Sequence, residues 1–470
     1  MRTPSALCSA LVTLALAITA QAGFVTRSGS QLQVDGTPFY FIGANAYWLM
    51  DTADSEVDTF FEYAQSYGLK VIRFWGFNYE LPRAAGDYDV TQFKHLDYII
   101  RAASYKNIKL VLALGNTWKA YRSPEDMLRM AGVDPDQTDL LGMYRSREFE
   151  DFYMAHITSV VTRVNSYTGV KYSDDDTVMM WDVLNEPRCP GCNVDERADQ
   201  QGWLSRMADH LKSQAHNQLV ATGTEGYFTD EDNVRYNPGA GVSCEGEDWM
   251  AISNLGSVDV ATAHVYWRQM ESIPPDWSQC DWECYFSFYK QYVDRHASAA
   301  GSMGKPFVIE EMNVMASKFT PEQRAAFFQL AYDQLLDSKA NNGPLMGVMF
   351  WTVAIGKVAD DGYTIYLDVA LPSDQPPPDS PPSDSPSSDY PPSDYPPSGP
   401  APEIERGPVY VNDEGLDRFR RGDQRAACAE EASKMWLPAW TTNAVDAWSY
   451  MDRTKGKLVQ EVIKETGNQL

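Results

Sequence analysis

The apolar residues of this chain follow two spacings in turn: short continuous runs, and longer stretches with an apolar residue every three or four positions. The continuous runs, such as V-M-M-W-D-V-L at residues 178–184, predict strands buried on both faces, as in a parallel sheet. The strands are expected at residues 39–43, 70–75, 108–114, 178–186, 218–222, 258–263, 307–310 and 346–350. The helices are expected at residues 57–67, 91–105, 148–167, 196–216, 282–300 and 321–337. Strands and helices that alternate in this way predict an α/β fold, a (β/α)8 TIM barrel.

Two segments lie outside this repeat. Residues 24–38 alternate polar and apolar around an Asp-Gly turn, which predicts a β-hairpin that caps the bottom of the barrel. Residues 121–146 are a long polar insertion, expected to form a rim loop with a short helix at residues 124–130. Within the repeat, Thr91 is expected to cap the helix that it begins.

The composition changes after residue 370. Residues 371–402 hold 13 of the 28 prolines, in Pro-Pro-Ser-Asp-Tyr repeats, and predict an extended linker. Residues 403–470 return to a mixed composition, with a helical pattern at residues 456–466. We interpret that helix as the eighth helix of a barrel that otherwise spans residues 23–370. The alternative is an appendage over residues 403–470.

The first 22 residues have the pattern of a secretory signal. Arg2 supplies the positive end, an apolar run begins at Leu11, and Ala20-Gln21-Ala22 forms an A-x-A cleavage site. No other run reaches the ~18 apolar residues of a membrane span. We therefore expect a secreted, soluble mature chain that begins near Gly23.

The 470 residues carry a formal net charge of −26, from 39 Lys and Arg against 65 Asp and Glu. Nucleic acids and anionic membranes require a basic patch, so neither is expected as a partner. A neutral or cationic substrate is compatible with this charge. The chain also has 13 Trp and 26 Tyr, whose rings can stack on the apolar faces of sugars.

Two of the predicted strands end in carboxylates. Pro187 ends the first of them, so Asn185 and Glu186 lie where that strand opens into a loop. Residues 306–312 (P-F-V-I-E-E-M) are a second strand, which ends in two carboxylates. The C-terminal rim of a β/α barrel carries its chemistry, and two carboxylates about 5–5.5 Å apart are what retaining glycoside hydrolysis needs. The alternative is a glutamate that only forms a salt bridge at a strand end.

The sequence N-E-P-R-C-P-G-C at residues 185–192 resembles the acid/base motif of glycoside hydrolase family 5, and specifically of its eukaryotic-type endo-β-1,4-mannanases. Five further motifs match in order: V-I-R-F-W-G-F-N at residues 71–78, N-T-W-K-A-Y at 116–121, G-T-E-G-Y at 223–227, H-V-Y at 264–266 and F-W at 350–351. The resemblance extends over residues 23–366. Six motifs in order are far more specific than any one of them.

The resemblance implies that Glu186 is the general acid/base and Glu311 the nucleophile of a retaining reaction. The acid must be protonated near neutral pH, which requires a raised pKa, whereas the nucleophile must stay ionised among hydrogen-bond donors such as Arg73. The other substrate-binding residues that the resemblance implies are Trp75, Asn116, Trp118, Asn185, Glu225, His264, Tyr266 and Trp351. Asn185 would bind the sugar 2-hydroxyl, His264 and Tyr266 would orient the nucleophile and the sugar, and Trp351 would stack under the scissile sugar. For His264 and Trp351 the alternative is a place in the barrel core.

The residues after Glu311 depart from the family pattern, in which an aromatic residue and a glycine follow the nucleophile. Here Met312 and Asn313 follow, which bears on substrate affinity more than on reaction type. Because side chains alternate along a strand, only one of Glu310 and Glu311 is expected to face the lumen. The alignment selects Glu311, with Glu310 as the alternative nucleophile.

Removal of the signal leaves six cysteines, an even number that suggests disulfides in a secreted chain and allows 15 pairings. The pairs expected are Cys189–Cys192, which the resemblance favours, Cys280–Cys284, the natural local pair, and Cys244–Cys428, which would be left over. The alternative for the C-x-x-C is a zinc or redox site, but no second such pair and no histidine cluster accompany it. No metal site and no cofactor are expected.

The expected function is that of a secreted, monomeric, retaining endo-β-1,4-mannanase acting on mannan, glucomannan or galactomannan. One alternative is an endo-β-1,4-glucanase or another family 5 activity. The other is a catalytically weak carbohydrate-binding wall protein on the same scaffold. The C-x-x-C directly after N-E-P-R favours the mannanase, and the presence of both carboxylates argues against a protein that only binds.

Overall fold

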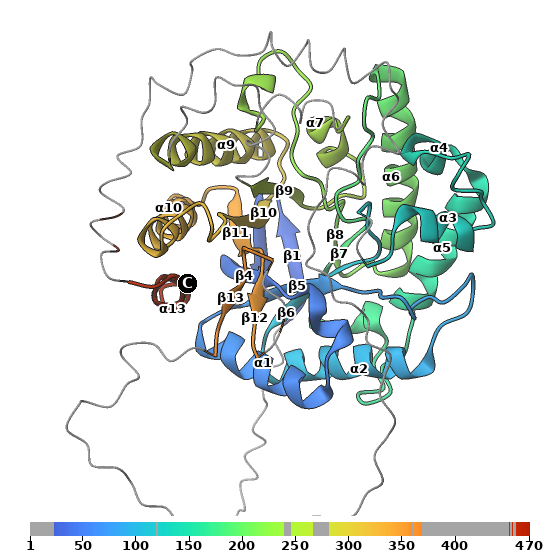
Figure 1. The fold of residues 1–470 in the computed structure, drawn as a ribbon, viewed down its shortest axis with the longest axis horizontal. Helices are drawn as coiled ribbons and strands as arrows, with labels where there is room; N and C mark the ends of the chain where they lie inside the picture. The colour runs from blue at the N-terminus through green and yellow to red at the C-terminus, as the bar shows by residue number, and fades with distance from the viewer. Residues whose placement is uncertain are drawn as a thin grey trace, which may run out of the picture.

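The computed structural model describes residues 23–118, 121–238, 246–266, 282–356, 361–368 and 457–470, with single residues at 358, 451 and 454. Within this part of the chain, eight parallel strands form the central sheet, and helices surround it (Figure 1). The strands are β4 (Phe41–Asn45), β5 (Val71–Trp75), β6 (Lys109–Ala113), β7 (Val178–Asp182), β8 (Leu219–Ala221), β9 (Ala261–Tyr266), β10 (Phe307–Asn313) and β11 (Leu345–Phe350).

The central sheet closes into a barrel. Neighbouring strands pair in parallel in the order β8–β7–β6–β5–β4–β11–β10–β9. At the remaining seam, the Asp259 N–H donates to Val220 O at 2.8 Å and the His264 N–H donates to Glu225 O at 3.1 Å. Helices cover the outside and side chains fill the lumen, which explains why the strands read as continuous apolar runs. The (β/α)8 prediction is confirmed.

The long helices lie around the barrel (Figure 1), and shorter elements lie in the connections between strands and helices. The long helices are α1 (Asp54–Ser66), α2 (Val90–Tyr105), α5 (Arg147–Val161), α6 (Val194–Gln214), α9 (Trp282–Ser302), α10 (Pro321–Ala340) and α13 (Val459–Gly467). The shorter elements are α3 (Pro124–Met130), α4 (Leu140–Arg145), α7 (Trp249–Ser253), the 3-10 turns η1 (Tyr47–Asp51), η2 (Tyr172–Asp174) and η3 (Val234–Tyr236), and the strands β12 (Val353–Ala354) and β13 (Ile365–Tyr366).

The start of α2 differs from the prediction. Asp89, not Thr91, is its N-cap: the Asp89 carboxylate accepts the N–H of Thr91 at 2.6 Å and of Gln92 at 3.0 Å. A carboxylate can satisfy two of the unpaired N–H groups of a first turn at once, and its charge favours the positive end of the helix. Asp89, two positions before Thr91, therefore caps the helix in place of the predicted hydroxyl.

Helix α13 lies beside α10 (Figure 1). Its residues Val459, Val462 and Ile463 are buried in the same apolar core as the barrel strands. At its C-terminal end Gly467 packs backbone to backbone against Gly68, which follows α1. A Cβ atom on Gly68 would lie only 2.7 Å from Gly467 Cα, so this contact requires glycine. Helix α13 thus extends from α10 to the end of α1.

A small antiparallel sheet covers the bottom of the barrel. Its strands are β1 (Val25–Ser28), β2 (Gln31–Val34) and β3 (Thr37–Pro38). Asp35 and Gly36 both take positive φ, 50° and 79°, as the tight turn between the last two strands requires. Gln31 Nε2 donates to Gly343 O at 2.8 Å, just before β11. The predicted hairpin around Asp35 and Gly36 is therefore present as β2 and β3, and β1 is an additional strand paired with β2.

The insertion at residues 121–146 is more structured than expected. Helix α3 forms at the predicted residues, but α4 was not predicted, and apolar side chains such as Leu128 and Tyr144 are buried. Helix α5 ends at Val161, six residues before the predicted end. The sequence pattern missed α4 because a helix of 6 residues is too short to show a periodic repeat.

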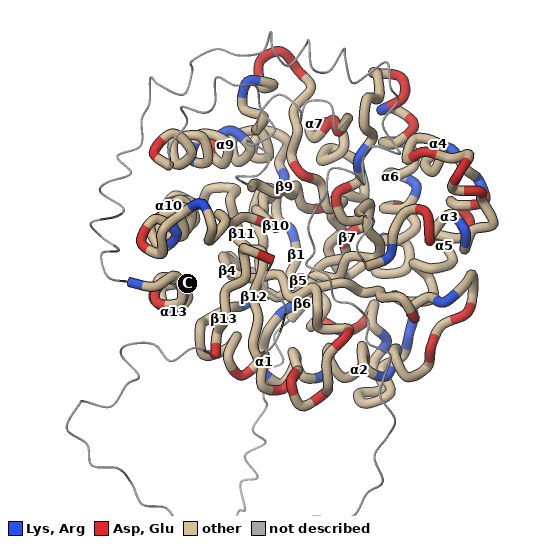
Figure 2. The backbone as a smooth tube through the Cα atoms, viewed as in Figure 1, with Lys and Arg blue, Asp and Glu red and all other residues tan. Residues whose placement is uncertain are grey.

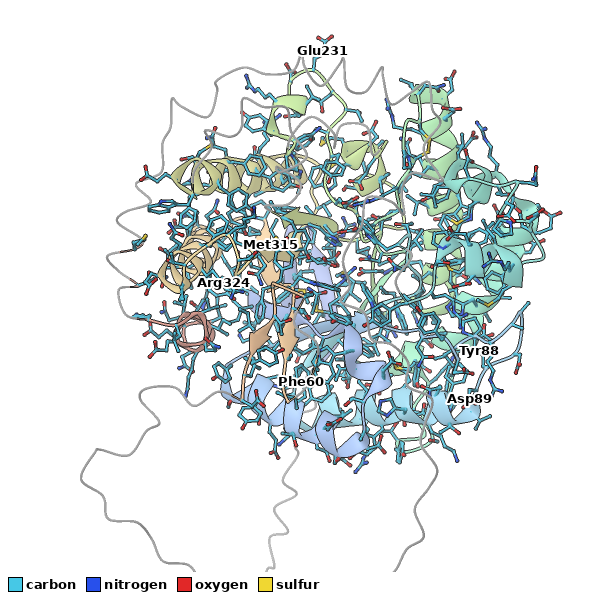
Figure 3. The ribbon with its side chains drawn as sticks, viewed as in Figure 1. Phe60, Tyr88, Asp89, Glu231, Met315 and Arg324 are labelled. Carbon is cyan, nitrogen blue, oxygen red and sulfur yellow. A yellow bond between two sulfur atoms is a disulfide. The ribbon has the colours of Figure 1, made fainter. Side chains whose placement is uncertain are left out.

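Charged residues of both signs stand mainly on the outer helices and loops (Figure 2). Figure 3 shows the contrast between the two sides of the helical layer: Phe60 of α1 is fully buried, whereas Glu231 projects from the loop after β8. In the part of the chain that the structure describes, no helix combines the length and the apolar character needed to span a bilayer.

Candidate active site

The predicted site residues meet at the C-terminal ends of the barrel strands. They are Arg73 and Trp75 on β5, Asn116 and Trp118 after β6, Asn185 and Glu186 after β7, Glu225 after β8, His264 and Tyr266 on β9, Glu311 on β10, and Trp351 after β11. Three aromatic side chains, those of Trp118, Tyr266 and Trp351, are partly exposed, and the other members of the set are buried.

Glu186 has an unusual backbone conformation. Its φ is +49°, in the left-handed region that residues other than glycine rarely adopt. Its N–H donates to Gly223 O at 2.8 Å, and its carbonyl oxygen accepts the Thr117 hydroxyl. The chain segments after β6 and β8 therefore hold this conformation from both sides. A strained residue held by its surroundings is typical of a functional site.

The Glu186 carboxylate faces three donors. Oε1 lies 2.7 Å from His264 Nδ1, while Oε2 accepts the Trp118 indole N–H and lies 3.4 Å from Arg188 Nη2. Burial by itself would raise the pKa of Glu186. The hydrogen bond to His264 and the charge of Arg188 outweigh burial, and they lower the pKa of Glu186 to about 2.

Glu311 lies close to Glu186. Its Oε1 is 2.5 Å from Arg73 Nη1 and 3.7 Å from His264 Nδ1, and its Oε2 accepts the Tyr266 hydroxyl. One oxygen of each carboxylate and a ring nitrogen of His264 all lie within 4.8 Å of one another. Burial raises the pKa of Glu311, and the nearby Glu186 charge adds to this rise, against the charges of His264 and Arg73.

Arg73 is fully buried and contacts four polar side chains. Nε donates to Asp182 at 2.7 Å, Nη1 to Glu311 at 2.5 Å and to Asn45 at 3.0 Å, and Nη2 to Asn185 at 2.7 Å. Burial opposes its charge, but the surrounding carboxylates raise the pKa of Arg73 further above its ordinary value. Arg73 is therefore a fixed cation that connects Glu311, the nucleophile candidate, to Asp182, Asn45 and Asn185.

The amide of Asn185 is oriented from both ends. Its Oδ1 accepts from Arg73, and its Nδ2 donates to Asn116 Oδ1 at 3.0 Å. Asn116 Nδ2 in turn lies 3.4 Å from Trp118 O. These two hydrogen bonds fix the orientation of the Asn185 amide, so its oxygen and its nitrogen cannot exchange places.

The directions of the two carboxyl pKa shifts differ from the expectation. Glu186, expected to have a raised pKa, has a lowered one, and the pKa of Glu311 is raised instead. His264 is the reason. Burial opposes its charge, but the charge of Glu311 and the hydrogen bond to Glu186 raise the pKa of His264 to about 10. A doubly protonated His264 donates from Nδ1 to Glu186 and keeps that carboxylate ionised.

Glu310 also faces the lumen, so the expected strict alternation is wrong. The pairing of β10 with β9 changes register between Ile309 and Glu311, which makes Glu310 the extra residue of a β-bulge. Glu310 Oε2 lies 3.5 Å from His264 Nε2. The two consecutive carboxylates of β10 therefore reach the two different nitrogens of one imidazole ring.

Aromatic rings form part of the wall of the site. The Trp351 ring stacks on Tyr47 with centroids 5.0 Å apart and planes 14° apart, and Trp75 lies 5.9 Å from Trp351. Trp351 Nε1 donates to Asp361 Oδ2 at 2.7 Å, which fixes the ring. Sequence reasoning missed Tyr47 and Asp361. The position of Tyr47 just after the first strand was the signal that could have identified it.

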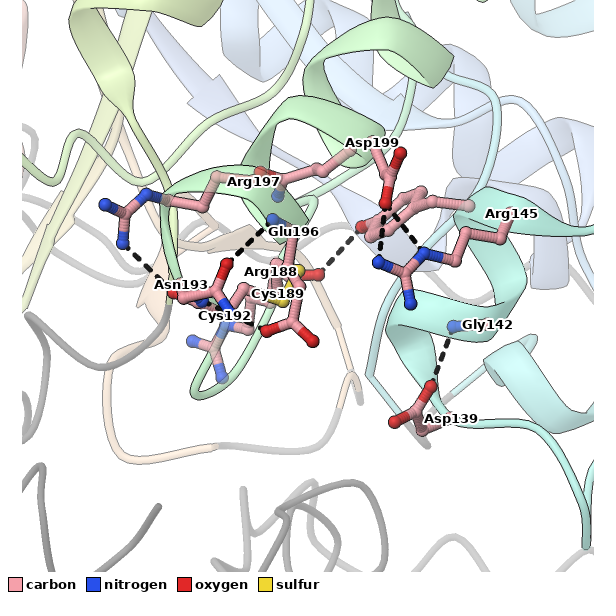
Figure 4. The surroundings of a disulfide bond; sticks show 12 residues. Asp139, Gly142, Arg145, Arg188, Cys189, Cys192, Asn193, Glu196, Arg197 and Asp199 are labelled. Atoms are coloured by element: carbon pink, nitrogen blue, oxygen red, sulfur yellow. Dashed lines mark hydrogen bonds and ion pairs between the residues drawn. A yellow bond between two sulfur atoms is a disulfide. The ribbon is translucent and has the colours of Figure 1, made fainter.

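Arg188 joins Glu186 to Glu225. Its guanidinium donates to both Glu225 oxygens, at 2.5 and 2.6 Å, and lies 3.8 Å over the Trp118 ring. The Cys189–Cys192 disulfide follows Arg188 directly, at the N-terminus of α6 (Figure 4). That predicted pair is confirmed. The prediction gave Arg188 no role of its own, although it stands inside the N-E-P-R-C motif.

The other predicted disulfides are described only in part. Cys284 on α9 is disulfide-bonded. Its expected partner Cys280 lies outside the described residues, as do Cys244 and Cys428. The pairings Cys280–Cys284 and Cys244–Cys428 stay predictions.

The departure from the family pattern after Glu311 has a structural consequence. Met312 is fully buried. Asn313 Nδ2 donates to Tyr363 O at 2.8 Å and also to Trp351 O, so this side chain ties the end of β10 to the loop after β11. A glycine at this position could not make these contacts. The asparagine thus helps to place the Trp351 backbone.

By spacing alone, Glu186, His264 and Glu311 could each offer one atom to a metal ion. A doubly protonated imidazole has no lone pair to offer a metal, and here Nδ1 donates to Glu186. The charges of this group therefore suit acid–base chemistry better than metal binding.

Comparison with known proteins identifies the family. Residues 136–378, just over half of the chain, match the family model described as GH family 5 beta-mannosidase-like. The chain belongs to glycoside hydrolase family 5. It is 30% identical over 374 residues to mannan endo-1,4-beta-mannosidase 1 of Arabidopsis thaliana, in an alignment that covers 75% of this chain and 87% of the relative.

Solved structures agree with the family 5 assignment. The endo-1,4-beta-mannanase from Rhizomucor miehei is 30% identical with a TM-score of 0.61, over 74% of this chain and 95% of that one. The endo-beta-1,4-mannanase from Thermotoga petrophila is 27% identical with a TM-score of 0.62, over 72% of this chain and 75% of that one. The family predicted from the six motifs is confirmed.

Proposed function

We propose that this family 5 chain is a retaining endo-β-1,4-mannanase in which Glu311 is the nucleophile and Glu186 the general acid/base. The observation that carries the proposal is the pair of buried strand-end carboxylates with oxygens within 4.8 Å of each other. Retaining enzymes hold their carboxyls about 5–5.5 Å apart, whereas inverting enzymes need about 6.5–9.5 Å to admit a water between them. The spacing supports double displacement.

The surroundings of Glu311 favour its role as nucleophile. Arg73 donates a hydrogen bond to its Oε1, and Tyr266 donates one to its Oε2. Such donors hold the carboxylate in one orientation for attack on the anomeric carbon. They also stabilise its negative charge before attack and the charge that returns when the glycosyl ester is hydrolysed.

The proton for the leaving oxygen has a defined source. In the free protein it stands on His264 Nδ1, 2.7 Å from Glu186. Transfer to Glu186 leaves a neutral imidazole, and Glu186 then protonates the leaving oxygen while Glu311 forms the glycosyl ester. In the second step Glu186 takes a proton from water, the resulting hydroxide releases the sugar from Glu311, and the proton returns to His264. Each proton and bond is thereby accounted for.

The substrate assignment rests on the relatives and on the rings around the site. Mannan, glucomannan and galactomannan are the proposed substrates, because the named relatives are mannan endo-1,4-beta-mannosidases. The partly exposed Trp118 and Trp351 rings suit stacking on sugar faces, and we assign to Asn185 a hydrogen bond to the 2-hydroxyl. We further propose a monomer that is secreted, since residues 1–22 have the signal pattern.

The proposed organisation places the catalytic barrel at residues 23–370 and a linker at residues 371–402. The C-terminal segment, residues 403–470, would then return the chain to the barrel through α13. The burial of α13 against α10, and its contact with Gly68 after α1, support its assignment as the eighth barrel helix.

The first test is reducing-sugar release by the mature chain on linear mannan, galactomannan and carboxymethylcellulose. Glu186→Gln and Glu311→Gln should each lose activity on mannans by roughly a hundredfold or more. Release from the cellulose derivative instead would keep the mechanism and replace the substrate. No release from any polymer by a folded protein that still binds a mannan column would support the binding-protein alternative.

The second test assigns the nucleophile. A 2-deoxy-2-fluoro-β-mannosyl fluoride should trap the glycosyl enzyme, and mass spectrometry of peptides should place the label on Glu311. Label on Glu310 instead would make Glu310 the nucleophile in place of Glu311. Proton NMR of the first product should show the β anomer, and an α anomer would reject retention.

A further inference from the structure

A second pair of carboxyls, Asp182 and Glu310, lies beneath the catalytic pair and has no part in the mechanism above. We call it the lower pair. Asp182 ends β7 and Glu310 stands on β10, two strands that are not neighbours in the barrel. Both side chains are fully buried, and the charge of Glu310 contributes to a raised pKa of Asp182. Two neighbouring carboxyls that are both buried cannot both ionise without a high cost, so one of them holds a proton.

The charge of the whole lumen requires protons on its carboxyls. Four acids and two cations gather there: Asp182, Glu186, Glu310, Glu311, Arg73 and His264. If all four acids were ionised, two negative charges would be left unpaired among buried side chains, because Arg188, the further cation near Glu186, is already paired with Glu225 at 2.5 Å. Unpaired buried charges are energetically costly. Burial, then the neighbouring Glu310 charge, raise the pKa of Asp182 to about 8, so one of those protons resides in the lower pair.

Within the lower pair Glu310 carries the negative charge. Burial opposes its ionisation, but the charges of Arg73 and His264 lower the pKa of Glu310. Its Oε2 is 3.5 Å from His264 Nε2, while His264 Nδ1 faces Glu186 at 2.7 Å. The imidazole is thus a bridge between Glu310 below and the general acid/base above.

We propose that Glu310 is a positioning residue whose carboxylate, 3.5 Å from His264 Nε2, keeps His264 doubly protonated and so holds a proton beside Glu186. The inference rests on the proposed hydrolytic function and adds the residue that governs its acid step. It also gives a reason for the β-bulge in β10, since without the bulge the Glu310 side chain would leave the lumen.

Other ionisable groups also face His264. Glu186 lies on the β7 side, Glu311 on β10, and Glu247 in the loop before α7 interacts with the ring electrostatically. Burial raises the pKa of Glu247 to about 7 despite three backbone N–H donors. Because Glu247 is unchanged in every variant below, its titration cancels in the comparison.

The test is the pH profile of kcat/KM on mannohexaose for the full chain and two isosteric variants. Glu310→Gln removes the negative charge nearest Nε2. His264 and Glu186 should then lose their shared proton at a lower pH, and the basic limb should move down by about one pH unit. Asp182→Asn is the matched control: Glu310, the charge nearest Nε2, is kept, so the basic limb should move clearly less than in Glu310→Gln.

The leaving group separates this role from a purely structural one. A dinitrophenyl β-mannobioside needs no proton on its leaving oxygen, so the shift of the basic limb in Glu310→Gln should disappear with it. At pH 5, where His264 is protonated in both proteins, Glu310→Gln should be within about threefold of the wild type. A loss of equal size at every pH and with both substrates would mean that Glu310 only supports packing.

The remaining outcomes are also decisive. An unshifted basic limb in a folded Glu310→Gln would overturn the proposal. If Glu310→Gln does not fold, Glu310→Asp moves the charge away from Nε2 and should shift the limb in the same direction by less. If the wild type cleaves no mannan, the proposed function fails. The ¹⁵N shift of the His264 ring, assigned with His264→Gln, still reports whether Glu310→Gln lowers the pKa of His264.

Discussion

Replacement of Arg73 tests the electrostatic core of the site. Arg73→Met keeps much of the side-chain length but removes the cation that contacts Asp182 at 2.7 Å and Glu311 at 2.5 Å. Both partners are buried, so the variant leaves uncompensated carboxylates in the lumen. Removal of one partner of a buried ion pair typically costs about 3–5 kcal/mol, which for a barrel of roughly 350 residues corresponds to a fall in Tm of about 4–7 °C.

The cost of Arg73→Met should depend on pH. Without the cation the folded-state pKa values of Asp182, Glu310 and Glu311 all rise, so the native state binds more protons than the unfolded chain. Stability then falls as pH rises from the unfolded carboxyl pKa, near 4, toward the raised native values, by up to about 1.4 kcal/mol per pH unit for each proton. The deficit in Tm should therefore be smaller at pH 4 than at pH 8.

Thermal unfolding by circular dichroism at both pH values, with the disulfides intact, measures the effect. Arg145→Met is the matched control: Arg145 pairs with Asp199 at 2.7 Å, but both side chains are more than 40% exposed (Figure 4). Loss of that pair should cost less than about 1 kcal/mol. Equal deficits at pH 4 and pH 8, or a deficit for Arg73→Met no larger than for Arg145→Met, would refute the reasoning.

Three further outcomes are expected. Trp118→Phe removes an N–H donor to Glu186 and raises the pKa of that carboxyl, so the basic limb of kcat/KM on mannohexaose should move up; a downward move would contradict the assigned contact. Tyr266→Phe removes a donor to Glu311, so kcat should fall roughly a hundredfold and the acidic limb of the pH profile should move up. Unchanged kinetics would show that Tyr266 does not support the nucleophile. The folded-state pKa of His264 is raised to about 10, so its contribution to stability is present below its unfolded pKa, near 6.5, and is lost as pH rises through 10. Calorimetry should show Tm falling across this window in the wild type and falling less in His264→Gln.

Features that depend on local sequence were predictable. The barrel follows from continuous apolar runs that alternate with helical spacing, because each strand of a parallel sheet is buried on both faces regardless of its partner. The rim position of Glu186 follows from Pro187, which cannot continue the strand. The Cys189–Cys192 pair needed only a short loop and the motif around it. In each case the residues that decide the outcome lie within a few positions of one another.

Features that depend on contacts between distant residues were decided by the tertiary structure. The strict alternation expected for β10 failed because a register shift against β9 turned Glu310 into the lumen. The carboxyl pKa values moved opposite to expectation because His264, 78 residues from Glu186 in the chain, donates to it across the barrel. The sequence identifies which ionisable groups belong to the site. Which group holds the proton depends on distances of 2.5–3.7 Å between strands, because electrostatic energies in a buried site change steeply over that range.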